Sequence, residues 1–399
     1  MIQNYNEENK ERAFLISLDC GEYDAESSMA ELEELAKTSG AEIIGEMIQK
    51  RPAPEAATYM GKGALEEICN FCSNHNIDLI IADGELSPVQ IRNIEDLTGV
   101  RVIDRTTLIL DIFAGRARSS EGKLQVELAQ LKYSLPRLSG KGTALSRLGG
   151  DRRHIRFRIQ NLKAELDKVE KRRVAMHQRR KKNGALCVAI VGYTNAGKST
   201  LMNRLTDAGV LQEDKLFATL DPTARKLVLP DGRQIMLVDT VGLVRRLPHQ
   251  LVDAFRSTLE EAVWADVILN VCDASSDECA EHIGVTESVL SDLGCSGKPI
   301  INVLNKCDKP TELDFDFFEN SVKISAATGD GIDSLLTAIE NALPKDRKRV
   351  KILLPFDKMK LSSIVRDGTV HSEEYTENGV LYDATVNISD IKQLKDYII

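Results

Sequence analysis

The sequence lacks long apolar runs. Its longest, such as LIIA at 79–82 and CVAIV at 187–191, are much shorter than the roughly 18 residues that a membrane-spanning helix needs. These runs are typical of buried strands. The polar beginning of the chain, MIQNYNEENKER, does not resemble a signal peptide. We therefore expect a cytoplasmic protein without a membrane span, and we leave a membrane-associated fraction open.

Cysteine is also scarce, because eight residues in a chain of 399 form no disulfide framework. Cys69 and Cys72 make one C-x-x-C pair, and His75 follows three residues later. A zinc site would need a fourth ligand and a turn, but the surrounding residues have a helical pattern. Ordinary thiols on a helix are the better interpretation.

The chain has no overall positive charge that would indicate a nucleic-acid partner, since its net charge is −9. Residues 137–182 nevertheless contain sixteen Lys and Arg against four Asp and Glu, a net charge of +12. The remainder of the chain therefore carries −21. A basic segment on an acidic protein indicates that one element binds a polyanion.

The first part of the chain alternates between apolar and amphipathic segments. Strands are predicted at RAFLISLD (12–19), AEIIGEMIQ (41–49), IDLIIAD (77–83) and VRVIDR (100–105). The helix before the last strand has Ser87 as its expected N-cap and Gly99 as its expected end. This order predicts a small parallel sheet covered by helices.

The spacing of apolar residues then changes to one that is typical of two paired helices. Leu124, Leu128, Leu131, Leu135 and Leu138 are spaced 4-3-4-3, and a second heptad stripe runs through Ile155, Ile159, Leu162, Leu166, Val169, Arg173 and Met176. Two helices joined by the basic loop 139–150 are predicted to pack antiparallel. The RNA-binding candidates are Arg147, Arg152, Arg153, Arg156 and Arg158, and Lys171–Arg173 form a further basic cluster.

A phosphate-binding loop is predicted at GYTNAGKST. Gly192-x-x-x-x-Gly197-Lys198-Ser199 follows an apolar strand and begins a helix. The glycines allow backbone N–H groups to surround phosphates, and the N-terminus of the helix favours negative charge. Lys198 is expected to reach the β- and γ-phosphates, and Ser199 to bind Mg²⁺.

Later segments identify the nucleotide as GTP. LFATLDPT supplies Thr219 as a second hydroxyl for Mg²⁺, and VDTVG supplies Asp239 and Gly242 at a strand end. In VLNKCD, the carboxylate of Asp308 can accept two hydrogen bonds from the N1–H and N2–H₂ edge of guanine, which adenine lacks. KISAATG adds backbone contacts to guanine O6. Five such motifs in this order are not expected by chance.

The candidate site residues follow from these motifs. Lys198, Thr219 and Gly242 are the catalytic candidates, and Ser199, Thr219 and Asp239 are the Mg²⁺ candidates. The nucleotide-binding candidates are Gly192, Tyr193, Thr194, Asn195, Ala196, Gly197, Lys198, Ser199, Thr200, Phe217, Ala218, Thr219, Asp239, Thr240, Val241, Gly242, Asn305, Lys306, Asp308, Ser325, Ala326 and Ala327.

Two positions bear on the rate of hydrolysis. Many GTPases orient the attacking water with a glutamine directly after the glycine of the D-x-x-G motif, but here this residue is Leu243. We therefore expect slow hydrolysis by the isolated protein. Asn195 has two interpretations. It either helps to hold a K⁺ beside the phosphates, as in potassium-activated GTPases, or only hydrogen-bonds the first switch.

We expect an α/β multidomain protein with four parts. These are an N-terminal α/β domain (1–110), a basic helical hairpin (111–183), a Ras-like P-loop GTPase domain (184–345) and a small α+β C-terminal module (346–399). In the last, RVKILLPF and GVLYDATVNI are predicted strands and SDIKQLKDYI a closing helix.

Longer stretches resemble the HflX family of ribosome-associated GTPases over nearly the whole chain. They include DLIIADGELSPVQIRNIEDLTGVRVIDRTTLILDIFAGRARSSEGKLQVELAQLKYSLPRL, GYTNAGKSTLMNRLT, DKLFATLDPTARKLVLPDG and LVDTVGLVRRLPHQLVDAFRSTLEEAVWAD. The resemblance implies binding to the rRNA of the large (50S) ribosomal subunit, with the hairpin directed toward its functional centre, beside the binding of GTP and GDP. We expect a monomer, although the sequence itself does not reveal the oligomeric state. The resemblance also implies hydrolysis stimulated by ribosomes, and splitting or rescue of stalled ribosomes under stress.

One segment departs from the family pattern. Relatives usually have roughly fifteen more residues in the glycine-rich segment before the second hairpin helix, and surface loops tolerate such deletions. The shorter loop is either neutral or gives the tip less reach into the ribosome.

Two other functions remain open. The heptad stripe also fits a dimerisation coil in a GTP-dependent protein-binding switch, although like charges on its polar face disfavour a homotypic pair. YMGKGALEE at 59–67 could hold an anion and support ATP use by the first domain, but a plain turn before a helix is simpler.

Overall fold

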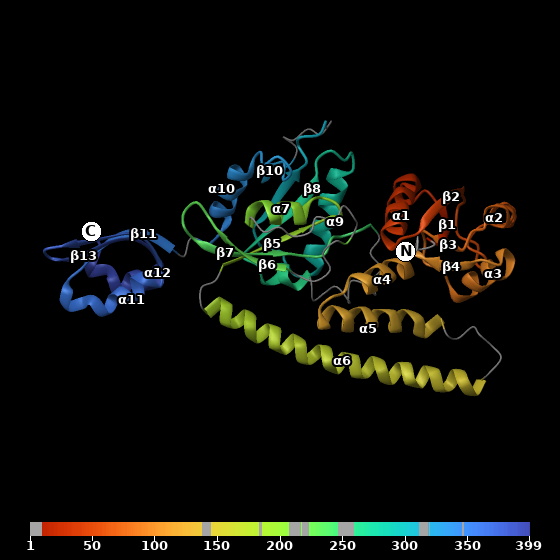
Figure 1. Ribbon diagram of the computed structural model, residues 1–399, viewed down its shortest axis with the longest axis horizontal. Coiled ribbons are helices and arrows are strands. Elements are labelled where there is room, and N and C mark those ends of the chain that lie inside the picture. The colour runs from red at the N-terminus through yellow and green to blue at the C-terminus, as the bar shows by residue number, and fades with distance from the viewer. Residues whose placement is uncertain are drawn as a thin grey trace, which may run out of the picture.

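The computed structural model describes residues 10–137, 145–182, 186–206, 217, 223–245, 259–310, 318, 320–344 and 347–399. Three sheets and a long helical hairpin follow one another along the chain (Figure 1). The expected α/β multidomain architecture is confirmed. Among the described residues, no helix is both long and apolar enough to cross a membrane.

The first sheet is parallel throughout, as predicted. Its strand order is β2-β1-β3-β4, and the strands are β1 (Arg12–Asp19), β2 (Glu42–Lys50), β3 (Leu79–Ala82) and β4 (Arg101–Asp104). The covering helices are α1 (Ala25–Ser39), α2 (Lys62–His75) and α3 (Pro88–Thr98). In α3, Ser87 and Gln90 form a reciprocal capping box and Gly99 ends the helix in the left-handed conformation, so both expected ends are confirmed.

A fourth helix, α4 (Arg105–Arg116), was not anticipated from the sequence. It begins directly after β4, where the Asp104 side chain accepts a hydrogen bond from the Thr107 N–H. Position 110, at which we expected the first domain to end, lies inside this helix. The segment shows little helical periodicity because Leu108, Ile109, Leu110, Ile112 and Phe113 are all buried, which leaves only a narrow exposed face around Asp111.

The hairpin consists of α5 (Ser120–Arg137) and α6 (Leu145–Lys182), which lie antiparallel (Figure 1). The leucine stripe of α5 is partly buried. The most buried side of α5 is a different one, formed by Val126, Ala129 and Tyr133, and it packs with α4. On α6 the stripe is least exposed at Leu162. The expectation that Met176 continues it is wrong, because Met176 is 49% exposed and the adjacent His177 is buried.

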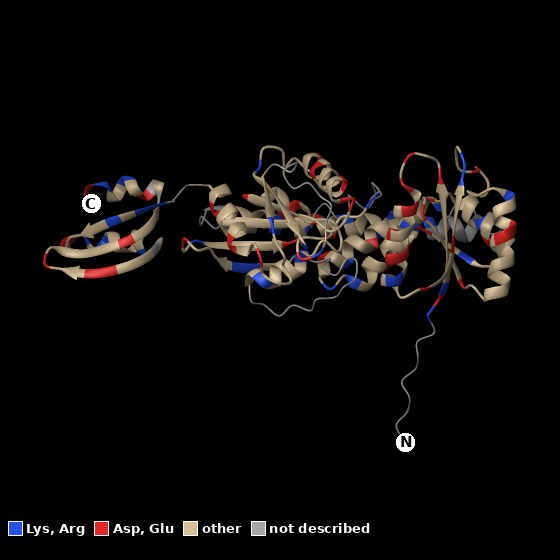
Figure 2. Ribbon diagram, turned by 90° about the horizontal axis from the view of Figure 1, so that it is seen from above, with Lys and Arg blue, Asp and Glu red and all other residues tan. Residues whose placement is uncertain are grey.

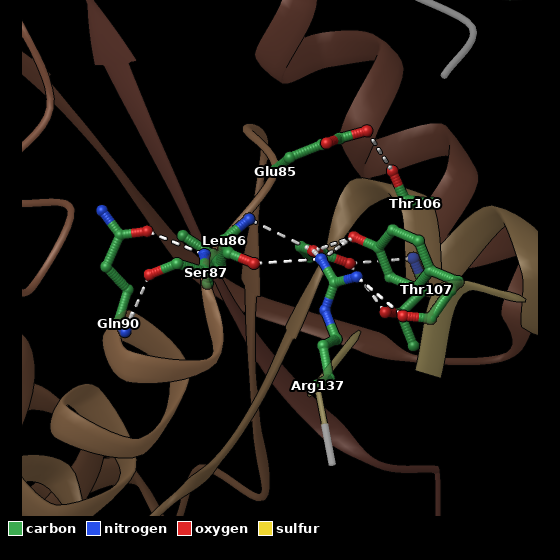
Figure 3. Close-up of polar contacts among 9 residues, drawn as sticks. Glu85, Leu86, Ser87, Gln90, Thr106, Thr107 and Arg137 are labelled. Carbon is green, nitrogen blue, oxygen red and sulfur yellow. Dashed lines mark hydrogen bonds and ion pairs between the residues drawn. The ribbon is translucent and has the colours of Figure 1, made fainter. Parts of the chain in front are cut away.

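Asp104 fixes the far end of α5 to the first domain (Figure 3). Its carboxylate accepts hydrogen bonds from the Leu86 N–H and the Tyr133 hydroxyl, and it pairs with Arg137 at 3.1 Å. The Arg137 guanidinium also lies over the Tyr133 ring, 3.3 Å from its centroid. Because Asp104 has no exposed surface, this network holds the hairpin rigidly against the first sheet.

The second sheet has six strands in the order β10-β9-β8-β5-β7-β6. They are β5 (Leu186–Gly192), β6 (Thr223–Val228), β7 (Gln234–Asp239), β8 (Val267–Asp273), β9 (Ile300–Asn305) and β10 (Ser321–Lys323). Only the edge strand β6 pairs antiparallel. The helices are α7 (Lys198–Thr206), α9 (Cys279–Asp292) and α10 (Ile332–Ala342), and residues 259–264 are helical.

The C-terminal module is an antiparallel sheet of order β11-β13-β12 with its own apolar core. The elements are β11 (Arg347–Leu354), η2 (Phe356–Leu361), α11 (Ser362–Arg366), β12 (Thr369–Thr376), β13 (Gly379–Asn387), α12 (Ile388–Leu394) and η3 (Lys395–Tyr397). Its two edge strands differ in charge (Figure 2), with Lys348, Arg349 and Lys351 on β11 and Glu373 and Glu374 on β12.

Candidate nucleotide-binding site

The phosphate-binding loop joins the end of β5 to the start of α7. Gly192, Asn195 and Gly197 have positive φ angles of 140°, 60° and 91°. A Cβ atom on Gly192 would lie 2.1 Å from the Val271 carbonyl oxygen. The loop therefore requires glycine for close backbone packing as well as for its conformation. This is the concave backbone turn that binds phosphates in P-loop proteins.

Lys198 is buried at the base of this loop. Its Nζ donates a 2.6 Å hydrogen bond to the Tyr193 carbonyl oxygen. Burial lowers the pKa of Lys198 to about 8, and the Asp239 carboxylate opposes the shift. The ammonium group is thus held where the negative charge of phosphates would favour its protonated form.

Two of the three Mg²⁺ candidates lie together. The Ser199 hydroxyl, at the start of α7, donates a 3.1 Å hydrogen bond to Oδ2 of Asp239 at the end of β7. A hydroxyl and a buried carboxylate are the oxygen ligands that Mg²⁺ prefers, so the residues fit this ion. Thr219, the third candidate, and Ala218 lie outside the described residues.

The guanine candidates gather at the ends of β9 and β10. The Asn305 side chain donates to the Ala196 carbonyl oxygen at 2.8 Å and accepts from the Ala326 N–H at 2.9 Å. Oδ1 of Asp308 accepts a 2.6 Å hydrogen bond from the Ser325 hydroxyl, which lowers the pKa of Asp308. Asp308 is therefore an anionic acceptor, as recognition of guanine N–H groups requires.

Two neighbouring cations support this region. Lys306 has a φ of 65°, and its Nζ pairs with Asp273 at 2.6 Å. The Arg204 Nε donates a 3.0 Å hydrogen bond to the Ala326 carbonyl oxygen, and the same guanidinium also contacts the Ala327 carbonyl. The backbone of the Ser325–Ala327 segment is thereby held beside Asn305 and Asp308.

The second switch begins at the end of β7 and lies against the phosphate-binding loop. The Leu243 N–H donates to the Gly192 carbonyl oxygen at 3.1 Å, and the Thr194 N–H donates to the Leu243 carbonyl oxygen at 2.8 Å. The Leu243 side chain is buried. A Cβ atom on Gly242 would lie 2.7 Å from Cγ2 of Thr194 and 3.0 Å from Nζ of Lys198, so only glycine fits there. The remaining candidates of these segments, Thr200, Thr240 and Val241, follow in α7 and the switch.

Two expected nucleotide-binding side chains face the protein interior instead. The ring of Phe217 is 2% exposed and packs edge-on against Phe113 of α4. Tyr193 stacks on His282 of α9 with ring centroids 3.8 Å apart. Only the backbone of these residues is available to a nucleotide.

The basic hairpin residues fall into two groups. On α6, Arg153 and Arg156 are exposed and Arg152 is partly buried. The side chain of Arg147 is outside the part of the chain whose side chains the structure describes. Arg158, in contrast, makes a bidentate ion pair with Glu127 of α5, both contacts being 2.7 Å. Its charge is therefore largely offset within the hairpin.

Arg173 was expected both in the heptad stripe and in the basic cluster, and the structure places it with the stripe. It is largely buried and pairs with Glu121 of α5 at 3.0 Å and with Glu260 of the 259–264 helical segment. Next to it, His177 lies 3.2 Å from Oε1 of Glu261 and stacks on Trp264. The hairpin is thus anchored to the GTPase domain shortly after the second switch.

Some residues around the site were missed by sequence analysis. Phe113 contacts Phe217 from α4, and Glu31 of α1 accepts a hydrogen bond from the N–H of Arg245, which follows the D-x-x-G motif. No motif marks them, because each contact joins segments far apart in the sequence.

Four family models match consecutive parts of the chain. They describe a GTP-binding GTPase N-terminal region (26–114), a GTP-binding GTPase middle region (116–180), a 50S ribosome-binding GTPase (187–306) and an HflX C-terminal domain (316–395).

Individual proteins resemble the chain over most of its length. GTPase HflX of Caldanaerobacter subterraneus subsp. tengcongensis is 50% identical, with 98% of this chain and 94% of the relative covered. GTPase HflX of Escherichia coli K12 is 40% identical over 84% of this chain and 83% of its own. The crystal structure of SsGBP in complex with GDP is 30% identical, with a TM-score of 0.51, and covers 83% of this chain and 98% of its own.

Proposed function

The chain belongs to the HflX family of GTPases, and from this premise we propose that Mg²⁺-GTP controls how firmly its α5–α6 hairpin binds the RNA of the large ribosomal subunit. Membership of the family makes it a protein that binds and hydrolyses GTP with Mg²⁺. The matching 50S ribosome-binding GTPase model supports the ribosome as the partner. Splitting or rescue of stalled ribosomes under stress is the proposed use of this binding.

The observation that carries the proposal is the position of the hairpin between the GTPase domain and solvent. Arg173 and His177 tie α6 to Glu260 and Glu261, in the helical segment of the GTPase domain that follows the second switch in the sequence. About five turns earlier, Arg153 and Arg156 are exposed. The base of a helix whose outer face is basic is therefore anchored to the GTPase domain, and phosphate contacts dominate RNA affinity.

The outer face of α6 also carries an exposed aromatic ring. Phe157 is 62% exposed and follows Arg156 directly. At 100° per residue it lies on the side opposite Ile155, Ile159 and Leu162, the stripe that faces α5. An aromatic ring among arginines supports RNA over protein as the partner, because unpaired bases stack on such rings.

In the proposed GTP complex, backbone N–H groups between Gly192 and Ser199 bind the phosphates, and Lys198 exchanges the Tyr193 carbonyl for phosphate oxygens. Ser199, Asp239 and Thr219 would hold the Mg²⁺, which neutralises charge on the phosphates. Gly242 would donate its N–H to the γ-phosphate. Leu243 offers no group to orient water, so hydrolysis is slow until the ribosome or a cation assists. Asn195 is the residue through which K⁺ would act.

Co-sedimentation with purified large subunits tests the proposal. The protein should pellet with subunits in a non-hydrolysable GTP analogue and less with GDP, and GTP hydrolysis should rise when subunits are added. Replacing Arg153 and Arg156 by glutamate should strongly reduce pelleting and lower the salt dependence of the binding that remains. The charge-matched control replaces Lys50 and Lys62 by glutamate. Both lie on the first domain, and their side chains are 89% and 92% exposed. Two results would contradict the proposal. One is equal pelleting with the GTP analogue and with GDP, and the other is pelleting of the arginine variant equal to that of the parent.

A further inference from the structure

The loop from Ser325 to Thr328, which follows β10, leaves one backbone donor available to a base. The Ala326 N–H donates to Oδ1 of Asn305 at 2.9 Å, and the Thr328 N–H donates to the Ser325 hydroxyl at 3.1 Å. The Ser325 N–H is also bonded within the loop. Among the residues that the structure describes, the N–H of Ala327 has no hydrogen-bond partner. Ala327 is exposed, so a ligand can reach this donor.

Arg204, in the last turn of α7, holds the peptide unit that carries this donor. Its Nε donates a 3.0 Å hydrogen bond to the Ala326 carbonyl oxygen, and the same guanidinium contacts the Ala327 carbonyl oxygen. The Ala326 carbonyl and the Ala327 N–H belong to one planar trans peptide unit, in which they point in opposite directions. The guanidinium on the carbonyl side therefore directs the Ala327 N–H away from α7.

The position of Asp308 indicates which atom of a base this donor would meet. Oδ1 of Asp308 accepts a 2.6 Å hydrogen bond from the Ser325 hydroxyl, so the carboxylate lies at the start of the loop. On guanine, O6 is next to N1–H, which is next to the 2-amino group. A guanine that donates from N1 and N2 to Asp308 thus presents O6, an acceptor, to the backbone that follows Ser325. The free donor in that stretch is the Ala327 N–H.

We propose that Arg204 is a positioning residue for base specificity: by holding the carbonyl oxygens of Ala326 and Ala327, it directs the Ala327 N–H at an oxygen on position 6 of the purine. The ligand selected by this contact is a 6-oxopurine nucleotide, and Asp308 adds the separate preference for a 2-amino group. Two donors on one rigid guanidinium leave the held peptide little freedom to rotate.

The size of the effect follows from the surroundings of the contact. Arg204 is exposed, so water competes for both carbonyl oxygens, and loss of the guanidinium should change affinities severalfold rather than abolish binding. The inference rests on the proposed guanine site and is independent of the proposed ribosomal partner.

The test is competition of purine nucleoside diphosphates against a fluorescent GDP on the full-length protein, because diphosphates exclude hydrolysis and the γ-phosphate from the measurement. 6-Thio-GDP replaces O6 by sulfur, a weaker acceptor, and reports the Ala327 contact. IDP keeps O6 but lacks the 2-amino group, and reports the Asp308 contact. The parent should bind GDP more tightly than either analogue.

Arg204→Met removes the guanidinium and keeps an apolar side chain of similar length. GDP affinity should fall about fivefold and the preference for GDP over 6-thio-GDP about threefold, while the preference over IDP stays within about twofold of the parent. Arg204→Lys keeps the charge without the forked donors and should restore part of the first preference. The control is Lys226→Met, which removes a charge from the exposed edge strand β6, at the opposite side of the sheet from β10, and should bind like the parent.

The inference is overturned if Arg204→Met weakens GDP, IDP and 6-thio-GDP by one common factor, as a purely structural role predicts. Unchanged GDP affinity, or a fall in the preference over IDP as large as the fall in the preference over 6-thio-GDP, would also overturn it. A parent that does not discriminate against IDP would contradict the guanine site itself, and with it the inference. Failure of the site is thereby distinguished from failure of the role of Arg204.

Discussion

Asn305 donates a 2.8 Å hydrogen bond from its side-chain nitrogen to the carbonyl oxygen of Ala196. The bond joins the guanine-recognition segment after β9 directly to the phosphate-binding loop. The two ends of the nucleotide site are thus one hydrogen-bonded unit, and a change at either end should affect the other.

Gly197→Ala tests this connection. The new Cβ would lie 2.2 Å from Nδ2 of Asn305, and the φ of 91° is unfavourable for alanine. We expect the affinities for GTP and GDP to fall together by about a hundredfold or more, because the clash and the strain add. Titration calorimetry measures both. Gly63→Ala, where a Cβ meets nothing within 4 Å, should bind both nucleotides normally. Normal binding by Gly197→Ala would contradict the prediction.

Asp308→Asn should change the preferred base. The carboxylate accepts hydrogen bonds from guanine N1–H and N2–H₂, whereas an amide can donate to the carbonyl that xanthine carries in place of the amino group. GTP affinity should drop by about ten- to a hundredfold, and xanthosine triphosphate should become the better ligand. Competition against a labelled guanine nucleotide reports both. Asp333→Asn, at an exposed position in the first turn of α10, serves as the control. An unchanged base preference would remove Asp308 from guanine recognition.

The lowered pKa of Lys198 predicts proton uptake on nucleotide binding. In the free protein the pKa is about 8, below the usual value of 10.5, because the ammonium group is buried. Phosphates stabilise the charged form and raise the pKa, so binding takes up close to no protons near pH 6.5 and about half a proton near pH 8. Affinity should therefore fall as the pH rises above about 8. Calorimetry in buffers of different ionisation enthalpy measures the number of protons taken up when the nucleotide binds. Proton release, or no uptake at either pH, would show that Lys198 is already charged.

Removing the Arg173 side chain should loosen the hairpin. Arg173→Gln leaves Glu121 and Glu260 without their shared cation, and these groups are about one quarter exposed. We expect a loss of roughly 1–3 kcal/mol in the free energy of unfolding, less than a fully buried pair would lose. Denaturant titration measures the change. Arg172→Gln, at an exposed neighbouring position, should be within about 0.5 kcal/mol of the parent.

The same Arg173 variant separates anchoring of the hairpin from nucleotide binding. GTP affinity should stay close to that of the parent, because the ion pairs of Arg173 join α6 to α5 and to the 259–264 segment. Stimulation of hydrolysis by large subunits should decrease, because an ion pair between α6 and the 259–264 segment of the GTPase domain is broken. A variant that loses stability but keeps full stimulation would show that the link is only structural.

Much of the site could be predicted from short segments of sequence. Gly192, Gly197 and Lys198 lie within one loop, whose conformation depends on the local absence of Cβ atoms, so their spacing alone indicates phosphate binding. Asp308 follows the apolar strand β9 and Ser325 follows its neighbour β10, and parallel strands of one sheet bring such ends together. Ser87 and Gly99 marked the ends of α3 by equally local hydrogen bonds.

Other features were decided only by tertiary structure. Phe113 and Phe217 are about one hundred residues apart, and no period or motif connects them. The expectation that Met176 would be buried failed because the heptad rule assumes a single partner helix, whereas this end of α6 meets both α5 and the 259–264 segment, which favours burial of His177. Local backbone chemistry therefore specified the nucleotide site. The packing of distant apolar and charged groups, which a linear pattern does not encode, determined how that site is joined to the first domain and the hairpin.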